Sequence, residues 1–223
     1  MTKKKRAAAI CCELNKEYGT EIPVTLKYDG DKPWQLLFAT MLSAQCTDER
    51  VNSVTEKLFI KYPSLVSFAE AEISELERDI YSIGFYHSKA YNIIRCANAL
   101  IEQYDSEIPS DIDELISLPG VGRKTANVVR GHIFNIPSIV VDTHVKRISR
   151  LVGLTDETDP EKIEYDLMKT VPKNQWILYN LQMITHGRKV CIARRPCCTE
   201  CVLKDICVYN CENEKKNSGF AEK

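Results

Sequence analysis

A lysine that follows a tight glycine turn is the residue in this sequence best suited to chemistry. In the segment Leu118–Val129, Pro119 and two glycines, Gly120 and Gly122, precede Lys124. Proline ends a helix, and glycines allow a turn in which the backbone approaches a ligand closely. We expect a new helix after Gly122, whose unpaired N–H groups and positive dipole end face the turn. The segment therefore predicts a site that grips a phosphate without reading a base.

Lys124 falls in the first turn of that expected helix, where the helix dipole disfavours a cation. Such an environment, together with other basic neighbours, leaves a fraction of a lysine amine uncharged, and the uncharged amine can act as a nucleophile. A lysine that only contacts phosphate is the alternative that the residues alone leave open. Downstream, Asp142 follows the apolar pair Val140 and Val141. Its carboxylate can assist a lysine nucleophile, or it can cap the next helix through backbone N–H groups.

Cationic residues accompany these two side chains in the sequence. The whole chain has a net charge of −1, but between Gly120 and Arg150 six basic residues stand against a single acid, Asp142. This local excess is compatible with binding to the DNA backbone, and equally with ordinary solvation of a surface. The six are Arg123, Lys124, Arg130, Lys146, Arg147 and Arg150.

Ten cysteines in the chain predict a metal site rather than disulfides. Six of them lie between Cys191 and Cys211. The segment Met1–Arg6 lacks the apolar core of a secretory signal, so we expect an intracellular protein, in which crowded thiols usually bind metal. No apolar run approaches the roughly 20 residues that span a bilayer, so no membrane partner is expected. Sulfur ligation of this kind suits both zinc and iron–sulfur clusters.

The elements that must position these residues are helices. In Trp34–Leu42 apolar residues recur at three- and four-residue spacing with apolar cover on most sides, which predicts a buried helix. Ser110 followed by Asp113 resembles a capping box, and Asp159–Pro160 is a helix start of the cap-then-proline kind. One strand-like stretch, 136–141, is too isolated to form a sheet. We therefore expect an all-α fold.

Two motifs together resemble the helix–hairpin–helix DNA glycosylases of the endonuclease III family. They are Leu118–Ala126, which reads Leu-Pro-Gly-Val-Gly-Arg-Lys-Thr-Ala, and Val141–His144, which reads Val-Asp-Thr-His. The likeness extends from about Leu36 to Tyr209 and includes the segments 42–48 and 83–90. It implies two helical domains with a DNA-binding cleft between them.

The domain boundaries follow from the same resemblance. A six-helix, barrel-like domain that carries the hairpin is expected at 26–136. An iron–sulfur cluster domain is expected at 1–25 and 137–211. The remaining residues, 212–223, are polar and have almost nothing to bury, so we expect a disordered tail there.

The resemblance implies that the chain removes oxidised pyrimidines from duplex DNA and then cuts the strand by β-elimination through a Schiff base on Lys124. Asp142 would stabilise positive charge on the sugar or deprotonate the lysine. The partner would be double-stranded DNA with an oxidised pyrimidine or an abasic site, bound by a monomer that is cytoplasmic and nucleoid-associated if prokaryotic. One alternative is a mismatch glycosylase, although such relatives generally lack the lysine, and those that remove adenine carry a glutamate near Ala39. The other is a non-enzymatic helix–hairpin–helix DNA-binding protein.

Members of this family flip the damaged nucleotide out of the duplex, because a base inside the stack cannot be reached. By position, Gln45 would fill the gap that the lost base leaves. Phe85, where relatives often carry leucine, would wedge into the stack from the opposite strand. Taken alone, Gln45 is an exposed residue at a helix end and Phe85 is a core aromatic. The other expected DNA contacts in these motifs are Gly120, Val121, Gly122, Arg123, Thr125, His144 and Arg147.

A ladder of four cysteines matches this family's spacing for a [4Fe–4S] cluster. Four thiolates satisfy such a cluster; a zinc site typically pairs two close cysteine couples, and this ladder has only one close couple. Cys197 and Cys211 lie beside the ladder, and either could replace a ligand. Arg194 and Arg195 suggest that the cluster shapes a basic loop for DNA phosphates. The ladder is Cys191-x6-Cys198-x2-Cys201-x5-Cys207.

Overall fold

The secondary structure consists of helices throughout the part of the chain that is described. The computed structural model describes residues 1–212, and this range contains no β-strand, so the all-α prediction is confirmed. The strand-like stretch 136–141 has no regular secondary structure. Of the tail predicted at 212–223, all but Glu212 lies outside the described residues. Among the described helices, none is long and apolar enough to cross a membrane.

The chain divides into two compact units. One is continuous, Val24–Ile136, and is called here the inserted unit. The other combines Met1–Pro23 with Pro137–Lys223 and is called here the terminal unit. The N-terminal helix therefore belongs to the same unit as the cysteine-rich segment.

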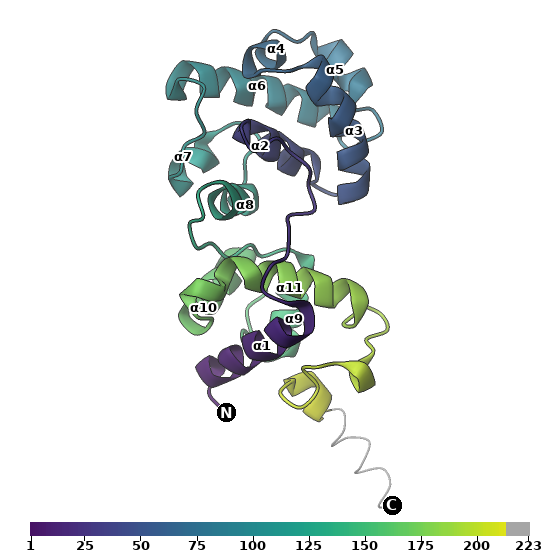
Figure 1. Cartoon of the computed structure of the whole chain (residues 1–223), viewed down its shortest axis with the longest axis vertical. Helices are drawn as coiled ribbons and strands as arrows, with labels where there is room; N and C mark the ends of the chain where they lie inside the picture. Colours follow the sequence, from purple (N-terminus) through teal and green to yellow (C-terminus); the bar gives the residue numbers. More distant parts are fainter. Residues whose placement is uncertain (213–223) are drawn as a thin grey trace, which may run out of the picture. The chain divides into compact units, whose positions relative to one another are not determined.

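The inserted unit is built around one fully buried helix. Every residue from Trp34 to Leu42 is buried, which confirms the helix predicted there. Its Trp34 and Phe38 pack edge-on against Phe68, with ring centroids 5.7 and 5.0 Å apart, an arrangement that favours aromatic pairs. In Figure 1, α6 lies beside α4 and α5, and α8 packs against both α2 and α7. The helices are α2 (Pro33–Leu42), α3 (Asp48–Lys61), α4 (Leu65–Ala69), α5 (Ile73–Asp79), α6 (Tyr86–Tyr104), α7 (Ile112–Ser117) and α8 (Arg123–Ile133).

The terminal unit has its own core. Its long helix α11 packs against α1 and α9, and α1 also contacts α10. Asp159 caps α10 by accepting hydrogen bonds from the backbone N–H groups of Glu161 and Lys162 at 3.1 and 3.0 Å, and Pro160 is the first helical residue, so the helix start predicted there is confirmed. The elements are α1 (Lys3–Tyr18), α9 (Thr143–Leu151), α10 (Pro160–Thr170), the 3₁₀ turns η1 (Lys173–Gln175) and η2 (Cys198–Glu200), and α11 (Trp176–Lys189).

The capping box predicted from Ser110 is wrong by one residue. Asp111 caps α7 and accepts hydrogen bonds from the N–H groups of Asp113 and Glu114 at 2.8 and 3.2 Å. The carbonyl of Ser110 instead accepts a hydrogen bond from Nε of Arg130, at 3.2 Å. Aspartate and serine cap helices about equally well, so local sequence does not choose between the two neighbours.

Candidate functional site

The turn between α7 and α8 leaves the start of α8 open. Gly120 has a φ of +76°, and a Cβ there would lie 2.7 Å from Cβ of Asn92 and 2.9 Å from Cε of Met41, so only glycine fits. Gly122 precedes the first helical residue of α8, and a Cβ there would have nothing within 4 Å. Val121 is 5% exposed, so it can offer a ligand only its backbone. The helix, turn and helix predicted from the sequence are confirmed.

Lys124 is the second residue of α8 and its side chain is exposed. It forms no hydrogen bond or ion pair with the described residues of the inserted unit. Its neighbours Arg123 and Thr125 are half-buried. A free ammonium therefore lies beside the open N-terminus of a helix, where two kinds of phosphate-binding group meet.

Gln45 and Phe85 share a backbone conformation that is uncommon for residues other than glycine. Their φ angles are 56° and 60°, in the left-handed region. Phe85 is 65% exposed, so the interpretation of this ring as a core aromatic is wrong. Residues held in sparsely populated backbone regions cost about 1–3 kcal/mol each, and they cluster at ligand sites. Two exposed side chains in this conformation are suited to contact a ligand.

A buried lysine, which the sequence did not single out, ties these two segments together. Lys89 is 8% exposed and lies one helical turn after Phe85. Its Nζ donates hydrogen bonds to the carbonyls of Leu42 and Ala44, at 2.9 and 2.7 Å. Its backbone N–H donates to the carbonyl of Phe85 at 3.1 Å. Burial lowers the pKa of Lys89. One residue thus holds the end of α2 and the carbonyl just before Gln45, beside the turn that carries Phe85.

In the terminal unit, Asp142 caps α9. Its Oδ1 accepts a hydrogen bond from the N–H of Val145 at 2.7 Å, so the capping role is confirmed. The other oxygen, Oδ2, accepts no hydrogen bond from the described residues of this unit. The capping hydrogen bond fixes the direction of the carboxylate.

His144 packs directly on α11. A Cβ on Gly187 would collide with the ring of His144, so this glycine makes room for the imidazole. Nδ1 of His144 is buried and has no hydrogen-bond partner among the described residues. Burial lowers the pKa of His144, and Arg147 and Arg188 lower it further, whereas Asp142 raises it. The ring is therefore neutral at pH 7.

The four cysteines of the ladder line one pocket of the terminal unit. Cys197 also lines this pocket, together with apolar side chains such as Ile148 and Leu203. Sγ of Cys211 lies 4.0 Å from the carbonyl of Asp205. Among the described residues, no three His, Cys, Asp or Glu side chains converge on one point that could hold a single ion.

Two side-chain nitrogens face sulfur atoms of the ladder. Arg147 donates to Sγ of Cys191 at 3.3 Å and to its carbonyl at 2.6 Å. Nε2 of His186 lies 3.5 Å from Sγ of Cys201, and its Nδ1 lies 2.8 Å from the hydroxyl of Tyr18. Burial lowers the pKa of His186 to about 4, so its ring is neutral and carries a single N–H. In the tautomer in which the Tyr18 hydroxyl donates to Nδ1, that N–H lies on Nε2 and faces the sulfur. Burial raises the pKa of Cys201 to about 11, so a thiolate there needs a cation.

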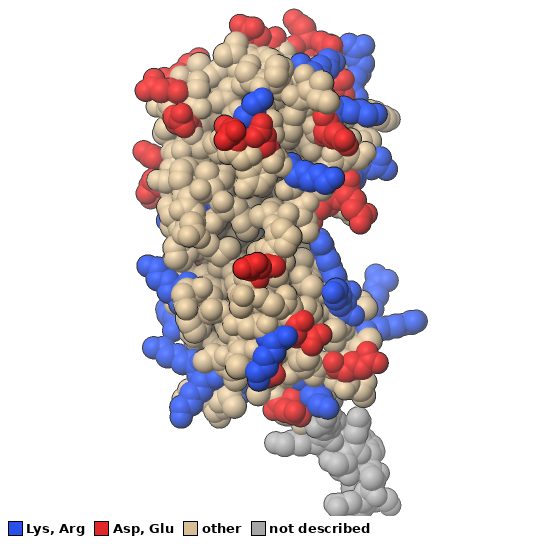
Figure 2. All heavy atoms as spheres, in the orientation of Figure 1, with Lys and Arg blue, Asp and Glu red and all other residues tan. Residues whose placement is uncertain are grey.

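The remaining basic residues of the terminal unit lie on its surface. Lys146, Arg147 and Arg150 line one open hollow of α9, and Figure 2 shows Lys and Arg side chains on both flanks of this unit. Arg194 and Arg195 are exposed in the loop between the first two ladder cysteines. Arg147 is expected as a DNA contact, but its guanidinium already donates hydrogen bonds to Sγ and the carbonyl of Cys191.

Comparisons with known proteins agree on one family. Residues 38–173 match the model of the HhH-GPD superfamily base excision DNA repair protein. Endonuclease III of Synechocystis sp. is 48% identical over 207 residues, which cover 92% of this chain and 93% of that protein. Endonuclease III of Bacillus subtilis is 45% identical, covering 82% of this chain and 84% of that protein. A solved structure of a trapped endonuclease III–DNA covalent intermediate has a TM-score of 0.88 and 41% identity, and covers 96% of this chain and 99% of that one.

Proposed function

The chain belongs to the endonuclease III family of the HhH-GPD superfamily of base excision DNA repair proteins, and from that premise we propose that it excises oxidised pyrimidines and cleaves the strand through Lys124. As a member of this family it is a DNA glycosylase with lyase activity. The residues of the two units support the proposed lesion class, nucleophile and cofactor.

The observation that carries the proposal is Lys124, which is exposed beside the open start of α8 and has no hydrogen-bond or ion-pair partner among the described residues of the inserted unit. In the proposed reaction its Nζ, as the free amine, attacks C1′ of the damaged nucleotide. The glycosidic bond breaks and the base leaves with a proton. The amine and C1′ then form a Schiff base with opening of the sugar. Loss of a C2′ proton breaks the bond between C3′ and its phosphate oxygen, which is β-elimination. Support for a covalent step comes from the similar endonuclease III that was trapped covalently on DNA.

Asp142 is proposed as the carboxylate of this reaction. One of its oxygens is used by the cap on α9, which holds the side chain in one direction, and the other is free within its unit. That free oxygen would accept the proton of the Lys124 ammonium or stabilise the positively charged sugar as the base departs.

The DNA contacts are proposed to be of two kinds. Gln45 and Phe85 would enter the base stack, because both are exposed at strained turns. The turn residues Gly120 to Gly122, with Arg123, Thr125 and the exposed pair Arg194 and Arg195, would hold phosphates without reading sequence. His144 is neutral and half-buried, and the guanidinium of Arg147 is hydrogen-bonded to Cys191. These two residues are therefore proposed to position the DNA-binding surface rather than to contact phosphates themselves. The protein is proposed to act as a monomer on duplex DNA.

The four ladder cysteines are proposed to hold a [4Fe–4S] cluster. They line one pocket with apolar walls, an N–H of Arg147 points at Sγ of Cys191, and Nε2 of His186 faces Sγ of Cys201. These features suit thiolates bound to a buried cluster. When bound, the cluster would supply a fixed scaffold for the loop that carries Arg194 and Arg195.

Borohydride trapping tests the nucleophile. Wild-type protein with abasic or oxidised-pyrimidine duplex should give a covalent adduct when the imine is reduced. Lys124→Gln should give no adduct and no strand cleavage while keeping most of its DNA affinity; Lys162→Gln, which removes an exposed lysine of α10, should behave as wild type. The absence of an adduct in the wild type would refute the lyase mechanism. An equal loss of affinity and cleavage in Lys124→Gln would favour a DNA clamp instead.

Two further measurements test the substrate and the cofactor. Duplexes with single lesions should be cleaved at oxidised pyrimidines and not at mispaired adenine; the reverse preference would favour the mismatch glycosylase. Purified protein should be yellow-brown with about four iron atoms per chain. Cys198→Ser should lose iron, whereas Cys197→Ser, at the exposed neighbouring position, should keep it. A colourless protein with one zinc, or iron loss only in Cys197→Ser, would contradict the proposed ligands.

A further inference from the structure

The inserted unit has a polar hollow of about 310 Å³ that contains neither Lys124 nor any of the proposed DNA-contact residues. It lies between α3 and the residues that precede Phe85. Positions 50, 53, 57 and 61 of α3 share one helix face, because they recur at three- and four-residue spacing. The hollow is lined by Arg50, Ser53, Val54, Lys57, Leu58, Lys61, Asp79 and Ser82.

The cations of this hollow are not all neutralised. Lys61 is held by carboxylates, with its Nζ 2.6 Å from Oδ2 of Asp79 and 2.7 Å from Oε1 of Glu75. Arg50 and Lys57 form neither an ion pair nor a side-chain hydrogen bond with the described residues of the inserted unit. Two free cations beside serine hydroxyls are the donor set that binds a phosphate, since arginine matches phosphate oxygens in pairs and lysine adds a point charge.

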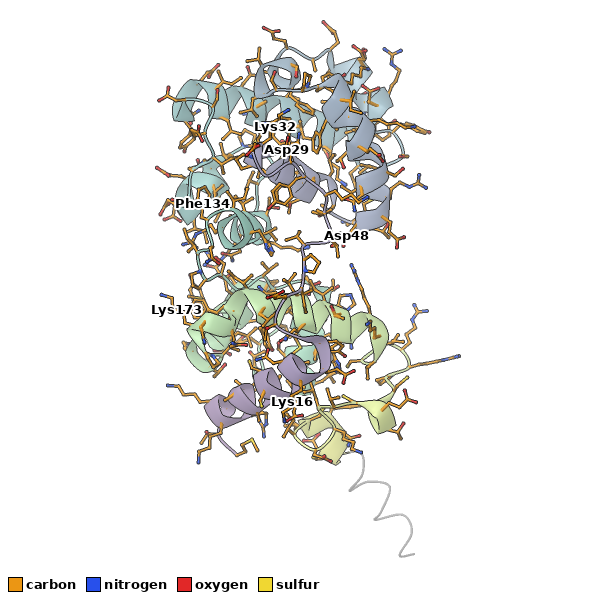
Figure 3. The ribbon with its side chains drawn as sticks, viewed as in Figure 1. Lys16, Asp29, Lys32, Asp48, Phe134 and Lys173 are labelled. Atoms are coloured by element: carbon orange, nitrogen blue, oxygen red, sulfur yellow. The ribbon has the colours of Figure 1, made fainter. Side chains whose placement is uncertain are left out.

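The position of the hollow connects it to DNA. Ser82 is three residues before Phe85, and Arg50 is five residues after Gln45. Figure 3 labels Asp48 at the start of α3, just after the segment that carries Gln45. Figure 2 shows Lys and Arg side chains, interspersed with Asp and Glu, along the edge where α3 lies. The hollow therefore adjoins both segments that are proposed to enter the base stack.

We infer that this hollow binds one phosphate of the DNA strand opposite the damaged base. The inference rests on the proposed function, because it needs Phe85 to enter the stack from that strand. A phosphate fixed by Arg50 and Lys57 would hold the opposite strand in register while the damaged nucleotide leaves the duplex. Such a contact adds affinity and position but reads no sequence.

Salt dependence measures the contact directly. The dissociation constant of a duplex with a stable abasic analogue is determined over a series of salt concentrations. The slope of log affinity against log salt is negative. If one phosphate contact is lost, the slope of the double variant Arg50→Gln/Lys57→Gln should be less negative than that of wild type by about 0.9. Lys57→Arg keeps the charge and should keep the slope; Lys162→Gln removes one charge from α10 and should also keep it. An unchanged slope in the double variant would overturn the inference.

The strand is identified with uncharged phosphates. Methylphosphonates are placed one at a time along each strand. At one position in the strand opposite the lesion, a methylphosphonate should weaken binding by wild type. The same methylphosphonate should not weaken binding by the double variant further, because that variant has already lost the contact with this phosphate. Additive losses at every position, or non-additivity only on the damaged strand, would overturn the assignment. Borohydride trapping at low salt separates the two proposals: an adduct in both proteins keeps Lys124 chemistry intact whatever happens at the hollow, and no adduct in the wild type refutes the proposed function alone.

Discussion

Replacing Lys89 by methionine should weaken excision more than it weakens the fold. Methionine keeps the length and the apolar stem of lysine but removes the ammonium that donates to the carbonyls of Leu42 and Ala44. Hydrogen bonds to charged groups are worth about 1.5–3 kcal/mol each. Part of this is returned, because burial disfavours the ammonium, as the lowered pKa of Lys89 indicates, and the exposed Ala44 can bind water instead. A net loss of about 1–3 kcal/mol in holding the Gln45 segment is expected.

That loss should appear in the lesion-specific steps. If Gln45 and Phe85 enter the stack as proposed, about 1–3 kcal/mol corresponds to a decrease of about 5-fold to 160-fold in single-turnover excision. The fluorescence of a 2-aminopurine beside the lesion reports insertion directly, and its change should slow in Lys89→Met by a similar factor. Affinity for undamaged duplex should stay near that of wild type, as should all three readouts in the control Lys162→Met. Wild-type excision and fluorescence in Lys89→Met, with only a lower melting temperature, would refute the positioning role.

Two other perturbations have signs that follow from the structure. Gly120→Ala should destabilise the protein by about 2–5 kcal/mol, because alanine would have a left-handed φ and would overlap Asn92 and Met41. Gly122→Ala should change the free energy of unfolding by less than about 0.5 kcal/mol. It should nevertheless weaken DNA binding, because its new methyl group occupies the open approach to α8. Chemical denaturation and DNA titration of both variants check this, and equal destabilisation would contradict it. Burial lowers the pKa of His132 from 6.5, so as the pH falls below about 6.5 the unfolded chain takes up a proton that the folded chain resists, and stability decreases. His132→Gln should lose less stability than wild type between pH 7.5 and 5.5 in urea titrations; parallel losses would show that His132 does not contribute.

Local patterns predicted the features that local energies decide. The buried helix at Trp34–Leu42, the glycine turn and the caps at Asp142 and Asp159 each depend on residues within a few positions of one another. The misplaced cap at Ser110 shows the limit of such patterns, since its neighbour caps equally well.

Long-range contacts could not be predicted in this way. Lys89 meets carbonyls 47 and 45 residues earlier, and Arg147 meets a cysteine 44 residues later. The sequence did contain a sign that Lys89 is buried, because this residue occupies the apolar stripe of α6, four residues before Ile93. A lysine at such a position must either reach solvent or find acceptors. Which acceptors it finds depends on how the chain folds back, and that information is not local.

The strained turns explain why a charged residue is buried in the inserted unit at all. Left-handed conformations at Gln45 and Phe85 each cost about 1–3 kcal/mol and persist only where the surroundings fix them. α2 ends just before the first turn and α6 begins at the second, so a single donor from α6 to the end of α2 can restrain both. An apolar residue at position 89 would spare the cost of burying an ammonium, but the hydrogen bonds from α6 to the carbonyls of Leu42 and Ala44 would be lost. The buried charge is thus better explained by the geometry of the two exposed side chains than by the stability of the core.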